Sequence, residues 1–203
     1  MEFVKNSVKN SSLKGLKIVL DCANGAAYEL APRLLADLGA ETVVINAAPT
    51  GRNINLTCGS LHPETLQAQV KAAGADLGLA FDGDADRLLL VDENGQLVDG
   101  DQVLFIVADH LHAQEKLAGK RVVATVMSNL GLERALSAIG VELVRTQVGD
   151  RYVVEAMRKH GYTLGGEQSG HVIFLDHNHT GDGLLTGLQV LAMTHDPEAF
   201  AQL

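Results

Sequence analysis

Tryptophan is absent from this chain of 203 residues, and aromatic side chains make up only 4% of it. Hydrophobic residues nevertheless account for 46%, so leucine, valine, isoleucine and alanine have to fill the core. No apolar run approaches the roughly 20 residues of a membrane-spanning helix, and the N-terminus lacks the apolar segment of a signal peptide. We therefore expect a cytoplasmic protein without a membrane partner.

Cysteine and basic charge are also scarce. The two cysteines, Cys22 and Cys58, lack the spacing of a zinc site. They are typical of free thiols in a cytosolic protein, with a single disulfide as the alternative. The 16 basic and 25 acidic side chains give a formal charge of −9. No basic run with interleaved aromatics occurs, which argues against a nucleic-acid partner.

Short apolar runs alternate with helical stripes along the chain, which predicts an α/β fold with a largely parallel sheet. The expected strands are residues 16–21, 42–45, 77–81, 88–91, 122–125, 141–144, 162–164 and 172–175. Helices are expected over residues 30–38, 66–73, 103–111, 132–139, 152–159 and 184–191. A turn is expected at Gly165-Gly166.

The pattern runs through two rounds of roughly a hundred residues each, which indicates two domains of similar size. The polar segment 1–12 is interpreted as the stub of a linker. Residues 13–99 are then the first domain and residues 100–203 the second, with the boundary near Gly100.

Three carboxylates lie on alternate residues of the sequence Asp-Gly-Asp-Ala-Asp-Arg, which spans residues 82–87. In a short loop, Asp82, Asp84 and Asp86 can turn towards one point, where they repel unless a cation neutralises them. Hard cations prefer carboxylate oxygens, so Mg²⁺ or Ca²⁺ is the first expectation. Arg87 adds a fixed positive charge that suits an anion beside the metal.

Two other interpretations of this loop are open. Asp and Gly are ordinary turn residues, although this turn follows an apolar strand, where α/β sheets usually bind ligands. An EF-hand is the other alternative, because Glu93 is the twelfth residue counted from Asp82. Its sixth position is Arg87 rather than the required Gly, and strands rather than helices are expected on both sides. A hard-metal site is favoured.

A second polar loop reads Gly-Gly-Glu-Gln-Ser-Gly-His over residues 165–171. Glu167, Ser169 and His171 are two residues apart and can project to one side. A carboxylate, a hydroxyl and an imidazole suit a polyhydroxylated ligand such as a sugar, and a hairpin with polar decoration explains the pattern equally well. The turn at Gly149-Asp150-Arg151 is either a phosphate or sugar contact or the start of a helix.

The two loops occur in the order and spacing of a known family, and the chain resembles the α-D-phosphohexomutases from about Leu13 to its end. Gln168 favours the branch that acts on glucosamine phosphates, since phosphomannomutase and phosphoglucomutase relatives usually have Met there. Further matching stretches are residues 21–26, 53–55, 58–60, 127–129 and 148–152.

The family has four domains, and the resemblance covers the second and third, each expected as an α/β/α layer around a small mixed sheet. The sequence contains neither the Ser-His-Asn-Pro loop that carries the family's phosphoserine nor the Arg-x-Ser-Gly-Thr-Glu-Pro loop that clamps phosphate. The chain is therefore expected to be a fragment without domains one and four and without a catalytic residue of its own.

The resemblance also implies roles for the two loops. Asp82, Asp84 and Asp86 would hold Mg²⁺ beside the phosphoserine, and Arg87 would stabilise the same charge. The substrate-binding residues that the resemblance implies in the second half are Glu167 and Ser169 on sugar hydroxyls, His171 near the reacting end of the sugar, and the turn Gly149, Asp150 and Arg151.

The implied reaction of the whole enzyme interconverts glucosamine 6-phosphate and glucosamine 1-phosphate, a precursor step of peptidoglycan synthesis. Such an enzyme is an isomerase that moves a phosphoryl group within the substrate. The alternatives are a mannose or glucose phosphomutase, or a metal- and sugar-binding module without chemistry. The sequence leaves the oligomeric state open.

Overall fold

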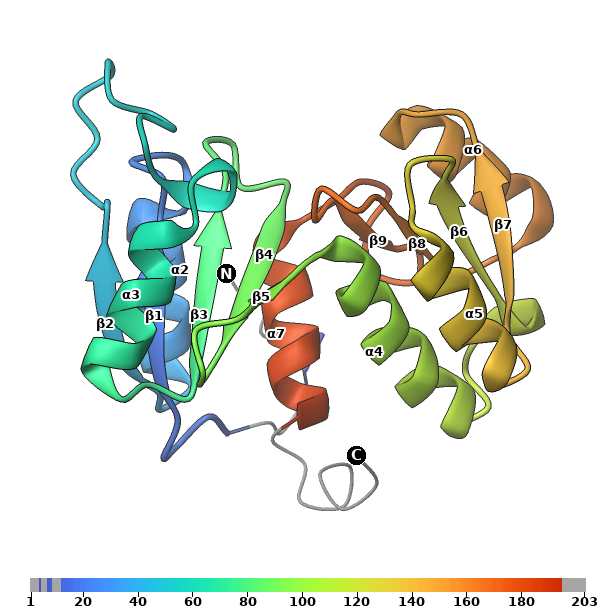
Figure 1. Cartoon of the computed structure of the whole chain (residues 1–203), viewed down its shortest axis with the longest axis horizontal. Coiled ribbons are helices and arrows are strands. Elements are labelled where there is room, and N and C mark those ends of the chain that lie inside the picture. The colour runs from blue at the N-terminus through green and yellow to red at the C-terminus, as the bar shows by residue number, and fades with distance from the viewer. Residues whose placement is uncertain (1–3, 5–6, 9–11, 195–203) are drawn as a thin grey trace.

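The computed structural model describes residues 4, 7–8 and 12–194, so most of the expected linker 1–12 lies outside the described residues. Two α/β layers lie side by side, and the helix α7 (Gly183–Thr194) lies between them (Figure 1). Among the described residues, no helix combines the length and the apolar character needed to cross a membrane.

The first sheet has the strand order β2-β1-β3-β4-β5. Strands β1, β2 and β3 are parallel, whereas β4 and β5 run antiparallel to their neighbours. Helix α2 links β1 to β2, and α3 links β2 to β3. The bounds are β1 (Lys17–Asp21), α2 (Ala27–Asp37), β2 (Glu41–Ile45), α3 (Glu64–Ala73), β3 (Leu77–Phe81), β4 (Leu88–Asp92) and β5 (Leu97–Val98).

The second sheet repeats this plan with the order β7-β6-β8-β9. Again three strands are parallel and the last is antiparallel. Strands β1 and β6 share one pattern of burial, and β2 and β7 share another. The bounds are α4 (Gly100–Ala113), β6 (Arg121–Thr125), α5 (Leu130–Ala138), β7 (Glu142–Thr146), α6 (Asp150–His160), β8 (Leu164–Gly166) and β9 (Val172–Phe174).

The expectation of a largely parallel sheet is wrong for the last strands, and the mixed sheets that the family resemblance implies are confirmed. Residues 82–87 alone connect β3 to β4, and residues 167–171 alone connect β8 to β9. Parallel neighbours need a crossover of a dozen or more residues, so these short loops force antiparallel pairing. As a result, the two loops hold equivalent places in the repeated unit.

The expected turn at Gly165-Gly166 is also wrong, because both glycines lie in β8. A Cβ on Gly165 would lie 2.6 Å from the Met157 sulfur and 2.9 Å from the Val123 carbonyl oxygen. Glycine is needed here for close packing of α6 on the sheet rather than for a turn. Strand β5 has only two residues and gave no signal in the sequence.

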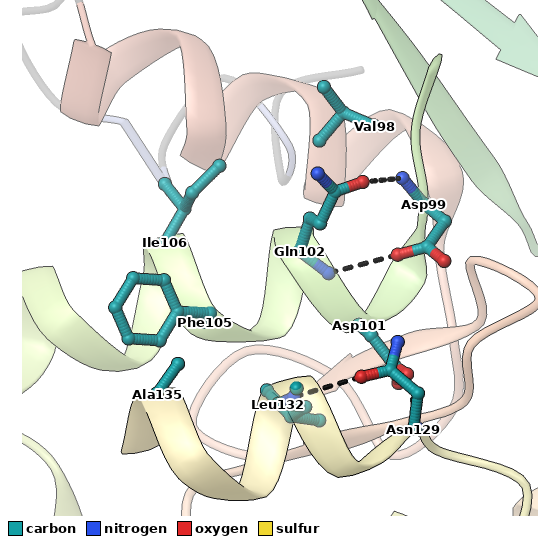
Figure 2. Close-up of a pocket in the computed structure, with 10 residues that line it drawn as sticks. Val98, Asp99, Asp101, Gln102, Phe105, Ile106, Asn129, Leu132 and Ala135 are labelled. Carbon is teal, nitrogen blue, oxygen red and sulfur yellow. Dashed lines mark hydrogen bonds between the residues drawn. The ribbon is translucent and has the colours of Figure 1, made fainter. Parts of the chain in front are cut away.

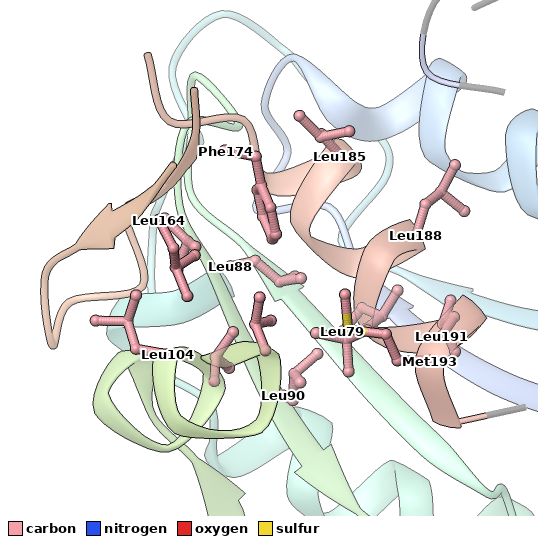
Figure 3. Close-up of a cluster of buried hydrophobic side chains, with 14 of the residues drawn as sticks. Leu79, Leu88, Leu90, Leu104, Leu164, Phe174, Leu185, Leu188, Leu191 and Met193 are labelled. Atoms are coloured by element: carbon pink, nitrogen blue, oxygen red, sulfur yellow. The ribbon is translucent and has the colours of Figure 1, made fainter. Parts of the chain in front are cut away.

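One hydrophobic core runs through both layers. It includes Leu34 of α2, Leu88 of β4 and Leu188 of α7, together with Leu104 and Leu164 of the second half. Figure 3 shows side chains of α7 and β4 facing those of α4 in this core. The opposite faces of the two sheets have smaller cores of their own, under α3 and α6.

Helix α7 approaches β4 closely although it comes last in the sequence. A Cβ on Gly187 would lie 3.2 Å from Leu88 Cδ2, and a Cβ on Gly183 would lie 2.7 Å from the Arg87 carbonyl oxygen. The helix thus covers part of the first sheet while its sequence belongs to the second half. The division into residues 13–99 and 100–203 stays a prediction.

Because α7 belongs to the shared core, replacing one of its buried side chains by a smaller one should lower the stability of the whole chain. Leu188→Ala should lower the free energy of unfolding by about 2–5 kcal/mol, because a buried leucine loses its contacts and leaves a cavity. Leu30→Ala is the matched control, because Leu30 is a helical leucine that is 46% exposed and should change stability by less than about 0.5 kcal/mol. Urea unfolding followed by circular dichroism measures both, and equal effects would contradict the shared core.

Candidate functional site

The two polar loops meet at the carboxyl ends of the parallel strands. Loop 82–87 follows β3, loop 167–171 follows β8, and both lie at the same edge of the molecule (Figure 1). The Leu88 N–H donates to the Gly170 carbonyl over 3.1 Å, and the Gly183 N–H donates to the Ala85 carbonyl over 2.9 Å. Backbone hydrogen bonds therefore join the acidic loop directly to the second half.

The three aspartates converge as their spacing predicts. One carboxylate oxygen from each of Asp82, Asp84 and Asp86 lies within 4.8 Å of the others. Asp82 is buried, Asp86 is half-buried and Asp84 is exposed. Asp86 Oδ1 is buried and has no hydrogen-bond partner. The cluster opens to solvent on the Asp84 side and keeps an unused ligand atom inside.

The electrostatics of the cluster are unfavourable without a cation. The pKa of Asp82 is raised from 3.8 to about 7, mainly by burial and also by a hydrogen bond with Asp86 and the charges of Asp86 and Asp84, while the Arg87 N–H lowers it. A divalent cation would relieve this repulsion and use the orphaned Asp86 oxygen. An all-oxygen set of this kind fits Mg²⁺. Because strands β3 and β4 flank the loop, an EF-hand is excluded.

Arg87 faces the cluster through both its backbone and its side chain. Its N–H donates to Asp82 Oδ1 over 3.1 Å, and its Nη1 lies 3.8 Å from Asp82 Oδ2. The side chain is 41% exposed, so the guanidinium can also reach an anion outside the cluster. Its Nε is buried and has no partner.

Glu167 and Ser169 lie together in the second loop, as the alternation predicts. The Ser169 hydroxyl donates to Glu167 Oε2 over 3.4 Å, and Glu167 Oε1 accepts from the Gly149 N–H over 3.1 Å. The second contact ties the loop to the start of α6, whose first residues Asp150 and Arg151 are exposed. These side chains offer hydroxyl-binding groups on one accessible rim.

His171 is placed differently from its two neighbours. Its side chain is 3% exposed, and Nδ1 lies 3.2 Å from Asp86 Oδ2. Its Nε2 accepts from the Gly181 N–H over 3.0 Å and lies 4.0 Å from Asp150 Oδ2. The hydrogen-bond pattern therefore assigns the proton to Nδ1, which donates to Asp86. The ring links the acidic loop to the second half rather than standing free on the rim.

The pairing of His171 with Asp86 was missed in the sequence, because residues from two different sheets carry no common local pattern. A second missed contact backs the acidic loop from the other side. The Ala26 N–H donates to the Gly83 carbonyl over 2.8 Å, and Gly25 lies so close that a Cβ would be 2.3 Å from the same oxygen. The only sequence signal was that residues 21–26 supported the family resemblance.

A cavity of about 490 Å³ lies between α4 and α5 (Figure 2), and Asp99 in its lining accepts from the Gln168 side-chain amide of the second loop over 3.3 Å. Its polar residues cap the two helices: Asp99 and Gln102 bond each other's backbone N–H groups, and Asn129 accepts from the Leu132 N–H. These hydrogen bonds cap the helix ends.

Two family models match consecutive parts of the chain. Phosphoglucomutase/phosphomannomutase alpha/beta/alpha domain II matches residues 1–95, and domain III of the same family matches residues 99–202. The chain belongs to the phosphoglucomutase/phosphomannomutase family. The resemblance to α-D-phosphohexomutases is thereby confirmed.

Curated relatives within this family are phosphoglucosamine mutases. That of Desulforamulus reducens is 57% identical over 196 residues, which cover 97% of this chain and 44% of the relative. That of Syntrophotalea carbinolica is 59% identical over 192 residues, which cover 94% and 42%. The chain thus spans less than half the length of the curated relatives it matches.

Solved structures of this family share the fold. A phosphoglucomutase/phosphomannomutase family protein from Burkholderia thailandensis has a TM-score of 0.83 at 35% identity, over 99% of this chain and 45% of that one. The N-acetylphosphoglucosamine mutase of Aspergillus fumigatus, in complex with GlcNAc-6P and magnesium, has a TM-score of 0.72 at 22% identity, over 99% and 51%.

The raised pKa of Asp82 predicts a pH dependence of the metal-free protein. A raised folded-state pKa contributes stability that is present below the unfolded value of 3.8 and is lost as the pH rises through about 7. Urea unfolding in a chelator across this window should therefore show falling stability. Asp82→Asn has no carboxyl proton to lose and should show a shallower slope, so identical slopes would contradict the burial of a titrating Asp82.

Proposed function

We propose that this chain forms the metal-binding and sugar-binding part of a phosphoglucosamine mutase, an isomerase that interconverts glucosamine 6-phosphate and glucosamine 1-phosphate. The observation that carries the proposal is the junction of two loops, one with three converging carboxylates and one with hydroxyl-binding groups. The 57–59% identity to phosphoglucosamine mutases supports this substrate over mannose or glucose phosphates.

Within this proposal, Asp82, Asp84 and Asp86 hold Mg²⁺, and Asp86 is oriented by His171. The cation supplies neutralisation of the charge on a transferring phosphoryl group. Arg87 adds positive charge from the chain itself, next to the same cluster. The chain contains no Ser-His-Asn-Pro loop, so in this proposal the phosphoserine comes from another domain of the enzyme.

The sugar is held from the second half. The Glu167 carboxylate accepts hydrogen bonds from its hydroxyls, and the Ser169 hydroxyl can donate to them or accept from them. Gly149, Asp150 and Arg151 lie next to these two side chains. The partners are then a phosphosugar and the remaining domains of the enzyme, in the cytoplasm. The Aspergillus fumigatus relative, solved with GlcNAc-6P and magnesium, supports both ligand classes.

A metal titration tests the first loop. Calorimetry with Mn²⁺ or Mg²⁺ should give one site, and Asp84→Asn should weaken it at least tenfold because one of three carboxylate ligands is lost. Glu155→Gln removes the same charge from an exposed position of α6 and should leave the titration unchanged. An unchanged titration with Asp84→Asn would sink the metal assignment.

A sugar titration tests the second loop. Glucosamine 6-phosphate should shift backbone NMR signals of residues 149–151 and 167–169 at saturating Mg²⁺, and more strongly than mannose 6-phosphate. Glu167→Gln should weaken this binding roughly tenfold, because hydrogen bonds to a charged group contribute about 1.5–3 kcal/mol. Tighter binding of mannose 6-phosphate would favour a phosphomannomutase instead.

A further inference from the structure

We propose that Asp21 is a positioning residue that sets the shape of the acidic loop without touching the metal. Its link to metal binding rests on the function proposed above. Asp21 is the last residue of β1 and is fully buried. Burying a carboxylate costs free energy unless hydrogen bonds satisfy it, so the position of Asp21 at this strand end calls for a physical explanation.

Three donors from three separate segments converge on Asp21. Its Oδ1 accepts from the Ala23 N–H over 2.9 Å. Its Oδ2 accepts from the Asn46 side-chain amide over 3.0 Å and from the Gly59 N–H over 3.0 Å. One side chain thereby fixes the turn after β1, the end of β2 and the segment before α3.

The first contact, with the Ala23 N–H, fixes the turn after β1, and that turn touches the acidic loop. Ala23 and Asn24 both have positive φ angles, of 51° and 46°, a conformation that Ala adopts only when its surroundings enforce it. The turn delivers Gly25 and Ala26 against Gly83, where the Ala26 N–H donates to the Gly83 carbonyl over 2.8 Å. Gly83 separates the ligands Asp82 and Asp84.

The third contact, with the Gly59 N–H, acts on the residue that precedes the same loop. A Cβ on Gly59 would lie 2.4 Å from the Phe81 carbonyl oxygen and 2.6 Å from the Ala23 Cβ. The hydrogen bond to Asp21 therefore holds Gly59 against the residue that immediately precedes Asp82. The two routes lead from Asp21 to the carbonyl groups of Phe81 and Gly83, the residues on either side of the ligand Asp82.

Only a carboxylate of this length suits the site. All three partners are donors, so both oxygens of Asp21 accept. An asparagine would turn an amide towards an N–H, and a glutamate would add a methylene to a fully buried position. Asp21→Asn therefore keeps the volume of the side chain and one acceptor oxygen, and replaces the other oxygen by an amide that faces a donor.

Mn²⁺ calorimetry on the full chain gives the first test. Residues that orient metal ligands typically change metal affinity about 10–100-fold, and we expect a loss in this range for Asp21→Asn. The matched control is Asp101→Asn, because Asp101 is also a buried carboxylate that accepts a backbone N–H, from Asn129 over 2.8 Å. It lies on α4, and its substitution should change the affinity less than twofold.

Hydrogen exchange of the metal-free protein gives the second test. Asp21→Asn should speed amide exchange in residues 82–87, and Asp101→Asn should not. Unchanged exchange in that loop, or Mn²⁺ affinity equal to that of the unsubstituted chain, would overturn the proposal. Should Asp21→Asn fail to fold, Asn46→Gly removes one of the three donors, accommodates the φ of 50° at that position, and should show a smaller change of the same kind.

The two readouts separate this proposal from the proposed function. If the unsubstituted chain binds no Mn²⁺ while Asp21→Asn still speeds exchange in loop 82–87, the metal site fails and the positioning role stands. If Mn²⁺ binds and neither readout responds to Asp21→Asn, the positioning role fails and the metal site stands.

Discussion

The packing of α7 on β4 is the contact on which the rest of the molecule depends. It places the last described helix against Leu88 and makes one apolar core out of two α/β layers. The same strand begins where the acidic loop ends, so the core also fixes that loop. The hydrogen bonds from Leu88 to Gly170 and from Gly183 to Ala85 then keep the two polar loops next to each other. The alignment of the site is a consequence of hydrophobic burial elsewhere.

This packing and these hydrogen bonds hold together a group of like charges that is unfavourable on electrostatic grounds. Three carboxylates lie in one loop, and burial together with the neighbouring carboxylates raises the pKa of Asp82 to about 7. Such a cluster persists because its backbone is held from several sides: by Gly25 and Ala26, by Gly59 beneath it, and by His171 from the second half. Contacts of this kind around the loop can keep its like charges close to one another, and a bound cation would neutralise them.

Local pattern predicted most of the helices and strands, since each has a clear apolar stripe or run. It failed where packing rather than periodicity decides. Gly165 and Gly166 look like a turn, yet both lie in β8, and the close approach of Met157 in α6 leaves no room for a side chain on Gly165. The antiparallel direction of β4 and β9 follows from short loops that were visible in the sequence, although the alternation of strands and helices suggested otherwise.

The two loops, their residue types and the family could be recognised from the chain alone, because alternating acids and a Gly-bounded Glu-x-Ser-x-His pattern are local features. The contacts that those residues make became visible only in the folded molecule. His171 pairs with Asp86 rather than lying exposed beside Ser169, and Asp21 reaches the acidic loop through Ala23 and Gly59. These contacts join segments from different strands and different sheets, and a linear pattern contains no measure of distance between segments that meet only on folding.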